Sequence, residues 1–95
     1  MTYEVVLSTA AQRDLNDLPL NLLSTLRTTH FPRMAANPRE VGRPKKGRLA
    51  GVFGYDFGPR RGYRILYEVL EAKRIILVIA TGTHDQAYRS AERRR

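Results

Sequence analysis

The chain has 95 residues, which suffice for one compact core and are too few for two domains of ordinary size, so we expect a single domain over residues 1–95. It has no cysteine, which excludes a disulfide framework and a thiolate metal site or nucleophile, and two histidines far apart, His30 and His84, make a poor zinc site. The formal net charge is +8, and all of this excess lies in residues 43–95.

The basic half of the chain suggests a polyanionic partner. Clustered Lys and Arg attract polyanions and supply the sequence-independent part of nucleic-acid affinity. A solubilising surface or an acidic protein partner would explain the same charge. No apolar run approaches the roughly 20 residues needed to cross a bilayer, and no signal-like segment precedes the first predicted strand. We therefore expect a cytoplasmic protein that is not bound to a membrane.

The first third of the chain predicts a strand and two short helices. Residues 3–7 are rich in β-branched and aromatic side chains and predict an opening strand. Leucine-rich stripes at helical spacing follow on each side of Pro19, which is suited to begin the second helix. Because a proline inside a helix removes a backbone hydrogen bond, we expect a kink or break near Phe31, just before Pro32. His30 lies next to this point and is interpreted as a surface or helix-end residue.

The rest of the chain predicts a basic loop and three strands. Residues 42–51 combine Gly and Pro with positive charges and are typical of a mobile loop, which would either grip phosphates or only connect two elements. Strands are expected at residues 52–57, 63–70 and 74–81, joined by tight turns. The last of them contains a continuous apolar run, as a central strand does.

The order of these elements predicts an α+β fold. We expect β-α-α-β-β-β with a short C-terminal helix, in which a small, mostly antiparallel four-stranded sheet carries the N-terminal helical hairpin on one face. The other face would be concave, partly basic and open to a ligand. We expect the terminal Arg93-Arg94-Arg95 to fray in solvent.

Arg64 stands out because it lies in the middle of a predicted strand. Alternation puts it on the face of Leu66 and Glu68, opposite the side chains that would form the core. An arginine there is costly to bury without a partner, so it either pairs with an acid such as Glu68 or Glu71 or points into an anion site. A structural ion pair is the more common of these two arrangements.

The segment after the last predicted strand holds a second group of polar side chains. His84 and Tyr88 are four residues apart, so a helical turn would place them on one side, with Arg89 next to Tyr88. An imidazole can move a proton near neutral pH, and an imidazolium can stabilise a developing phosphorane. A tyrosine here either covers the end of the sheet or stacks on a base of single-stranded RNA.

Two sequence blocks and the order of the elements resemble a known superfamily. The blocks are Gly-Tyr-Arg-Ile-Leu-Tyr-Glu-Val at residues 62–69 and Gly-Thr-His-Asp-Gln-Ala-Tyr-Arg at residues 82–89. Together with the opening strand and the Asn-Pro after the helical hairpin, they resemble the RelE/ParE superfamily of bacterial type II toxin–antitoxin toxins over nearly the whole chain. RelE-like members are ribonucleases that cut messenger RNA in the ribosomal A site, whereas ParE-like members inhibit DNA gyrase.

The resemblance to the RelE branch implies an endoribonuclease that needs no metal or cofactor. The RNA 2′-hydroxyl would attack the adjacent phosphate and leave a 2′,3′-cyclic phosphate and a 5′-hydroxyl. Arg64 would stabilise charge on the scissile phosphate, His84 would move a proton or bind the phosphate, and Tyr88 would stack on a base or assist proton transfer. The RNA-binding residues would be Lys45, Lys46, Arg48, Arg60, Arg61 and Arg89.

One strand departs from the family pattern. Several RelE-type nucleases carry lysines or other polar catalytic groups where this chain reads Tyr55-Asp56-Phe57, whose aromatic side chains are interpreted as packing residues. Asp56 would repel a phosphate or serve as a base, and loop cations would restore part of the positive charge. Two alternatives to RNA cleavage stay open: a ParE-like gyrase inhibitor that acts by binding, and a catalytically weakened toxin with a regulatory role.

The resemblance also implies a protein partner. Antitoxins of this family wrap an acidic or amphipathic, initially disordered segment around the toxin, and such binding would neutralise the basic sheet edge. We expect a cognate antitoxin, a monomeric free toxin and a hetero-oligomeric complex. The substrate would be messenger RNA in the ribosomal A site.

Overall fold

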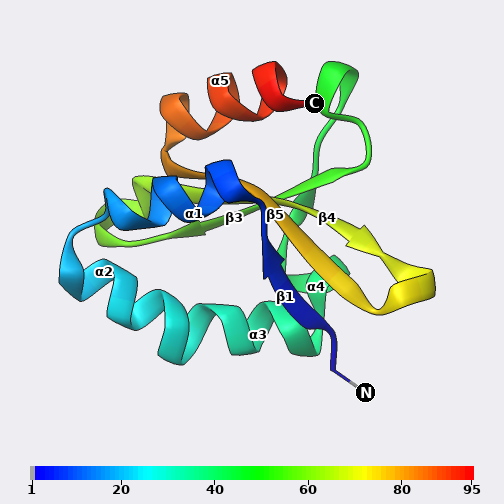
Figure 1. Ribbon diagram of the computed structural model, residues 1–95, viewed down its shortest axis with the longest axis horizontal. Coiled ribbons are helices and arrows are strands. Elements are labelled where there is room, and N and C mark those ends of the chain that lie inside the picture. The colour runs from blue at the N-terminus through cyan, green and yellow to red at the C-terminus, as the bar shows by residue number, and fades with distance from the viewer. Residues whose placement is uncertain (1) are drawn as a thin grey trace.

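A five-stranded sheet with helices on both faces forms the centre of the molecule (Figure 1). The computed structural model describes residues 2–95. The strands are β1 (Glu4–Leu7), β2 (Arg43–Pro44), β3 (Val52–Phe57), β4 (Tyr63–Leu70) and β5 (Ile75–Thr83). They lie in the order β1-β5-β4-β3-β2, where β1 runs parallel to β5 and the other neighbours are antiparallel. The predicted α+β class is confirmed, with one strand more than expected because β2 is only two residues long.

The helices occupy both ends of the chain. They are α1 (Thr9–Asn16), α2 (Leu20–Thr25), the π-helical turn η1 (Leu26–His30), α3 (Phe31–Ala36), α4 (Pro38–Val41) and α5 (His84–Arg94). Short 3-10 turns separate the later strands: η2 (Gly47–Leu49), η3 (Pro59–Arg61) and η4 (Glu71–Lys73). Within residues 2–95 no helix has the length and apolar character needed to span a membrane.

The irregularity expected near Pro32 is a π-helical turn. The chain stays helical from α2 through η1 into α3, and the Phe31 N–H donates to the Leu26 carbonyl, five residues back. In a regular α-helix the Pro32 ring would collide with the carbonyl four residues earlier and would offer it no N–H. A wider turn relieves this conflict without ending the helix. His30 is the last residue of the wide turn.

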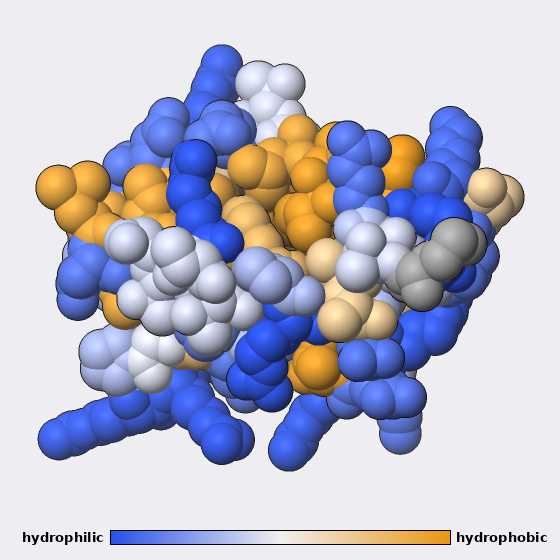
Figure 2. Space-filling model, turned by 90° about the horizontal axis from the view of Figure 1, so that it is seen from below, coloured by the Kyte–Doolittle hydropathy of each residue, from blue (hydrophilic) through white to orange (hydrophobic). Residues whose placement is uncertain are grey.

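The larger core lies between the sheet and the helices α1, α2 and α3. Both predicted leucine stripes point into it, and they meet the aromatic and β-branched side chains of β3, β4 and β5. Figure 2 shows that apolar side chains remain visible on the lower side of the molecule, between strongly hydrophilic ones at its rim. Fully buried members include Leu15, Leu26, Met34, Ile65, Tyr67 and Ile76.

The second face of the sheet is covered by α5, whereas the sequence predicted an open concave surface. Ala87 and Ala91 of α5 are fully buried against Leu66 and Ala80 of the sheet. Alanine side chains are small and let the helix lie close to the strands. The buried residues Ala87 and Ala91 are one turn apart, so they form a single stripe along α5. Figure 1 shows α5 on one side of the sheet and α2–α3 on the other.

The basic segment expected to be a mobile loop is a short hairpin arm. Residues 43–44 pair with β3, and the Lys45 N–H donates to the Val52 carbonyl at 2.8 Å. Leu49 in η2 is buried beneath α5, which anchors the tip of the arm. The backbone of this segment is therefore held by strand pairing and by one apolar side chain.

The terminal arginines are bound to the rest of the protein, so the predicted fraying is wrong for two of the three. Arg94 Nη1 donates to Asp14 at 2.7 Å and to the Ile79 carbonyl at 2.9 Å. Arg95 Nε donates to Glu68 at 2.8 Å, and its Nη1 donates to a carbonyl of the hairpin arm, next to which the C-terminus lies in Figure 1. These bonds fix the end of α5 to α1 and to the sheet.

We predict that Arg94→Ala lowers the free energy of unfolding by about 1–2 kcal/mol, because the charged hydrogen bonds to Asp14 are lost. Urea denaturation followed by circular dichroism measures the change. Arg93→Ala is the matched control, since Arg93 is the neighbouring exposed residue and makes no ion pair within residues 2–95. Equal effects of the two substitutions would contradict the anchoring role of Arg94.

Candidate active site

Arg64 is paired across the sheet with Asp56. The register of β3 and β4 sets these two residues opposite each other, and both side chains lie on the α5 face. Arg64 Nε donates to Asp56 Oδ1 at 2.5 Å. Arg64 is only 8% exposed, whereas the Asp56 side chain is 32% exposed and borders solvent. The guanidinium charge is thus buried together with the acid that balances it.

The acids that the sequence suggested as partners of Arg64 are engaged elsewhere. Glu68 accepts from Arg95, and Glu71 accepts from the hydroxyl of Tyr3 and from Arg39. Asp56 is the partner instead because strand pairing brings it directly opposite Arg64, although it is eight residues away in the chain.

Tyr88 and His84 extend the polar group from the sheet onto α5. Arg64 Nη1 donates to the Tyr88 hydroxyl at 2.6 Å, and the guanidinium carbon lies 5.1 Å from the centroid of the Tyr88 ring. The rings of Tyr88 and His84 are 5.0 Å apart, which confirms that the four-residue spacing places them on one side of a helix. The Arg64 bonds to Asp56 and Tyr88 use Nε and Nη1, and no hydrogen bond within residues 2–95 engages Nη2.

A capping box fixes the start of α5 and therefore the position of His84. The Thr83 N–H donates to the Gln86 side chain at 3.2 Å, and the Thr83 hydroxyl caps the first turn. The His84 N–H donates to the Gly62 carbonyl at 3.3 Å, which ties this point to the start of β4. The His84 side chain itself is 52% exposed and available to a ligand.

Lys45 supplies a cation next to β3, which carries no Lys or Arg of its own. Its Nζ lies 5.4 Å from the centroid of the Tyr88 ring, so it shares this ring with Arg64. The Lys45 stem crosses Gly54, where an added Cβ would come within 2.6 Å of the lysine Cε. The absence of a side chain at Gly54 is therefore what allows Lys45 to reach the site.

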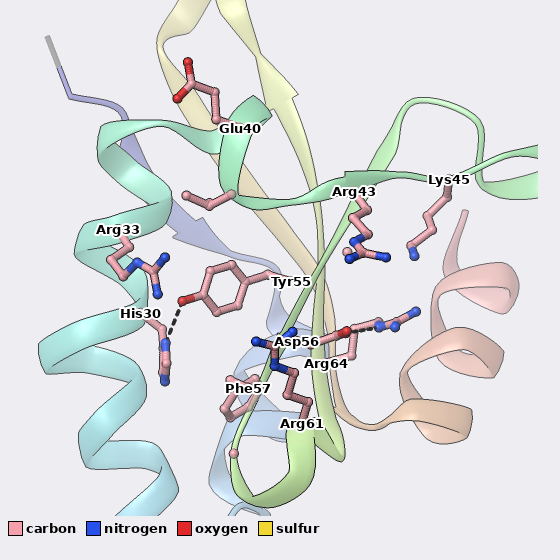
Figure 3. A pocket seen from close by; sticks show the side chains of 13 residues that line it. His30, Arg33, Glu40, Arg43, Lys45, Tyr55, Asp56, Phe57, Arg61 and Arg64 are labelled. Carbon is pink, nitrogen blue, oxygen red and sulfur yellow. Dashed lines mark hydrogen bonds and ion pairs between the residues drawn. The ribbon is translucent and has the colours of Figure 1, made fainter.

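A cleft of about 510 Å³ opens beside this group, along the outer edge of β3 (Figure 3). We call it the β3-edge cleft. Its polar and charged lining side chains are His30, Arg33, Glu40, Arg43, Lys45, Tyr55, Asp56, Arg61 and Arg64. Sequence reasoning missed Arg33, Glu40 and Arg43, since they come from segments far from the recognisable blocks.

The structure places three of the six predicted RNA-binding residues at a cleft or hollow and three elsewhere on the surface. Lys45 and Arg61 line the β3-edge cleft, and Arg89 borders a shallower hollow of about 390 Å³ together with His84 and Tyr88. The remaining three are exposed and line neither hollow: Lys46, Arg48 and Arg60. Among residues 2–95, no three His, Cys, Asp or Glu side chains are grouped as a metal site would require.

His30 has a polar partner that the sequence did not indicate. Its Nδ1 lies 2.7 Å from the Tyr55 hydroxyl, and the imidazole also contacts the ring of Phe57. Partial burial, with a smaller effect of the nearby Arg33 charge, lowers the pKa of His30 below its usual 6.5. Burial raises the pKa of Tyr55, which keeps its phenol protonated. The sequence indicates a surface or helix-end residue at His30; it ends the π-helical turn, but it is half-buried and bound to Tyr55 rather than exposed.

Comparison with known proteins decides the family. Residues 5–92 match the family described as "ParE-like toxin of type II bacterial toxin-antitoxin system". The chain belongs to this family of toxins. Toxin RelG of Mycobacterium tuberculosis is 32% identical to it over 90 residues, which cover 94% of this chain and 99% of RelG.

Solved structures of related toxins have the same fold. The toxin–antitoxin complex RelBE2 of Mycobacterium tuberculosis contains a chain that is 28% identical to this ParE-like toxin, with a TM-score of 0.79 over 88% of this chain and 100% of that chain. The intact RelBE toxin–antitoxin complex of E. coli matches at 20% identity, with a TM-score of 0.72 over 85% of this chain and 95% of that chain. The predicted RelE/ParE resemblance is confirmed.

We predict that Asp56→Asn in this ParE-like toxin tightens the binding of a non-cleavable oligonucleotide by roughly tenfold at low salt, because one negative charge beside Arg64 is removed. The same change costs about 1–3 kcal/mol of unfolding free energy, since Arg64 loses its charged partner. Fluorescence anisotropy and urea denaturation measure the two effects.

The control for Asp56→Asn is Asp17→Asn, which makes the same charge change at an exposed residue that lines neither the cleft nor the hollow beside His84. It should alter both quantities far less. If the two variants bind the oligonucleotide with equal affinity, Asp56 does not limit anion binding at Arg64.

We also predict that the His30 imidazole titrates below pH 6.5 in the folded protein and that Arg33→Ala raises its pKa. Because the unfolded chain binds this proton more readily, the free energy of unfolding should fall as the pH drops below about 6.5. Proton NMR of the imidazole over a pH series measures the pKa. Arg27→Ala, an exposed charge change in the same π-helical turn, is the control and should leave the pKa of His30 in place.

Proposed function

We propose that this toxin is a ribosome-dependent endoribonuclease that cuts messenger RNA in the ribosomal A site and so inhibits translation. The observation that carries the proposal is the 2.6 Å bond from Arg64 to Tyr88, with Lys45 over the same ring. It joins a phosphate-binding cation to a phenol on rigid elements at the mouth of a basic cleft. The RelE-like resemblance implies site roles for the same two residues, Arg64 and Tyr88.

The proposed reaction is an intramolecular transesterification at the phosphate. The RNA 2′-hydroxyl gives up its proton and attacks the adjacent phosphorus, the bond from phosphorus to the 5′-oxygen breaks, and that oxygen takes up a proton. The products are a 2′,3′-cyclic phosphate and a 5′-hydroxyl. Arg64 Nη2 and Lys45 Nζ bind the phosphate oxygens, whose negative charge increases in the transition state.

His84 and Tyr88 act on the protons and on the base. His84 is exposed at the first turn of α5, where its imidazole can move a proton or bind the phosphate. Tyr88 is held by Arg64, so its ring faces the substrate in one orientation and stacks on a base or assists proton transfer. Placement on β4 and at the capped start of α5 reduces the motion of these groups.

Inhibition of DNA gyrase by binding is the second candidate function. The Asp56–Arg64 ion pair favours it, because the strand arginine is already neutralised and a phosphate must compete with a carboxylate. In that case the basic surface contacts a protein or DNA and no proton transfer is required. A catalytically weakened toxin that regulates its own operon with an antitoxin would have the same geometry.

We propose a cognate antitoxin as the protein partner, in the cytoplasm. The similar structures RelBE2 and RelBE are described as toxin–antitoxin complexes. An acidic, amphipathic segment needs apolar and basic contacts. Partly buried apolar side chains at the border of the larger core supply the first, and the basic β3-edge cleft supplies the second. The free toxin is proposed to be a monomer that forms a hetero-oligomer on binding.

We predict that Arg64→Ala and His84→Ala each reduce cleavage of ribosome-bound messenger RNA by roughly 10²–10⁴-fold, since one loses charge stabilisation and the other a proton-transfer group. Tyr88→Ala removes the ring and the hydroxyl, whereas Tyr88→Phe removes the hydroxyl alone. If stacking matters most, Tyr88→Ala should lose more activity than Tyr88→Phe; if the hydroxyl matters most, the two variants should lose the same activity. Primer extension on a reporter message after brief induction measures the cuts.

Arg27→Ala is the surface control and should cut like the wild type. Cuts at translated codons that persist unchanged in Arg64→Ala and His84→Ala would contradict the nuclease assignment. Growth arrest with an intact message would instead support gyrase inhibition, which a supercoiling assay with purified gyrase tests directly.

A further inference from the structure

The β3-edge cleft continues beyond the proposed catalytic group. Arg64 and Lys45 stand at its α5 side, but the cleft passes over the outer edge of β3 to the opposite, helical side, where His30 and Arg33 line it (Figure 3). The passage is open because β2 pairs only with Phe53 and Gly54. Residues 55–57 have no strand on their outer side among residues 2–95.

Three arginines from three different elements point to this part of the cleft. Arg33 comes from α3, Arg43 from β2 and Arg61 from the turn before β4. None of the three has a carboxylate within ion-pair distance in the part of the chain that the structure describes. Their charges repel one another across the cleft, and an anion between them would relieve this repulsion.

A ring contact holds one of these arginines beside the cleft. The guanidinium of Arg33 lies 5.9 Å from the centroid of the Tyr55 ring, and the hydrogen bond between the Tyr55 hydroxyl and His30 keeps that ring in place. Arg61 lines the cleft from the turn before β4. The one acid at the far end of the cleft, Glu40, directs its carboxylate away from the arginines in Figure 3.

We propose that Arg33, Arg43 and Arg61 form a second phosphate-binding site, which holds backbone phosphates of a single-stranded RNA next to the phosphate at Arg64. The strand would leave the α5 side of the sheet, pass over the outer edge of β3 and end beside α3. The inference rests on the proposed nuclease function and names the path of its substrate. It assigns a binding role to Arg33 and Arg43, which lie outside both recognisable sequence blocks.

The chemistry favours an RNA strand over an acidic peptide. Guanidinium groups match phosphate oxygens with two parallel hydrogen bonds, and three of them around one cleft suit a ligand whose charges repeat at every backbone unit. The second site is also continuous with Arg64 and Lys45, so one strand can occupy both. The cleft volume of about 510 Å³ lies within the usual range for small-ligand sites and suits one or two nucleotide units of such a strand.

Two matched pairs of substitutions test the second site. Arg61→Ala is compared with Arg93→Ala, because both residues are exposed but only Arg61 lines the cleft. Arg33→Ala is compared with Arg27→Ala, because both are exposed on one continuous helix but only Arg33 lines the cleft. Affinity for a labelled, 2′-O-methylated oligoribonucleotide, which cannot be cleaved, is measured by fluorescence anisotropy over a salt series.

Arg61→Ala and Arg33→Ala should each weaken binding several-fold and reduce the slope of log K against log salt by roughly 0.7, the value for one lost phosphate contact on a single strand. Arg93→Ala and Arg27→Ala should bind like the wild type.

Equal affinities within each pair would overturn the inference. So would a difference within the pairs that is seen with an oligoglutamate peptide and not with the oligonucleotide, since the cleft would then bind a protein acid. These measurements do not depend on cleavage. Cutting of ribosome-bound message by the wild type is scored separately and decides the proposed nuclease function.

Discussion

The ion pair between Asp56 and Arg64 is the interaction on which the organisation of the site depends. An arginine buried under α5 would cost several kcal/mol without a partner, and the β3–β4 register supplies that partner directly across the sheet. The same guanidinium then binds the hydroxyl of Tyr88, so the sheet and α5 are joined by a polar contact as well as by alanine packing. The position of His84 follows, because it begins the helix that Tyr88 holds.

This pair also limits the chemistry. A carboxylate bound to the strand arginine reduces the charge available to a phosphate, and positive charge has to come from other elements. Lys45 provides it across Gly54, and Arg61 provides it from the turn before β4. A nuclease with this arrangement would depend on substrate that is already oriented, which agrees with cleavage on the ribosome. A toxin that acts by binding would use the same cations without the proton transfer.

The C-terminal end of the chain has a structural part in the site. Arg94 and Arg95 bind acids of α1 and β4 and backbone carbonyls of the sheet and the hairpin arm. They hold α5 over one face while the helices α1 to α3 cover the other, and the outer edge of β3 beyond the two residues of β2 is left open. Similarity to RelG extends over 94% of the chain, and the matching chain of the RelBE2 complex covers 88% of it with the same fold.

The sequence by itself determined the fold class, the family and the local partners. Period-two and helical spacing act over neighbouring residues, so they predicted the core face of β4, the two leucine stripes and the approach of His84 to Tyr88. Tertiary structure alone decided the contacts between distant segments. Strand register makes Asp56 the partner of Arg64, and the packing of α3 on the sheet brings His30 to Tyr55. The terminal arginines are expected to fray because they end the chain, but two of them bind acids of α1 and β4. Such contacts depend on which strands pair and which helix faces are buried, and no local pattern of side chains encodes that choice.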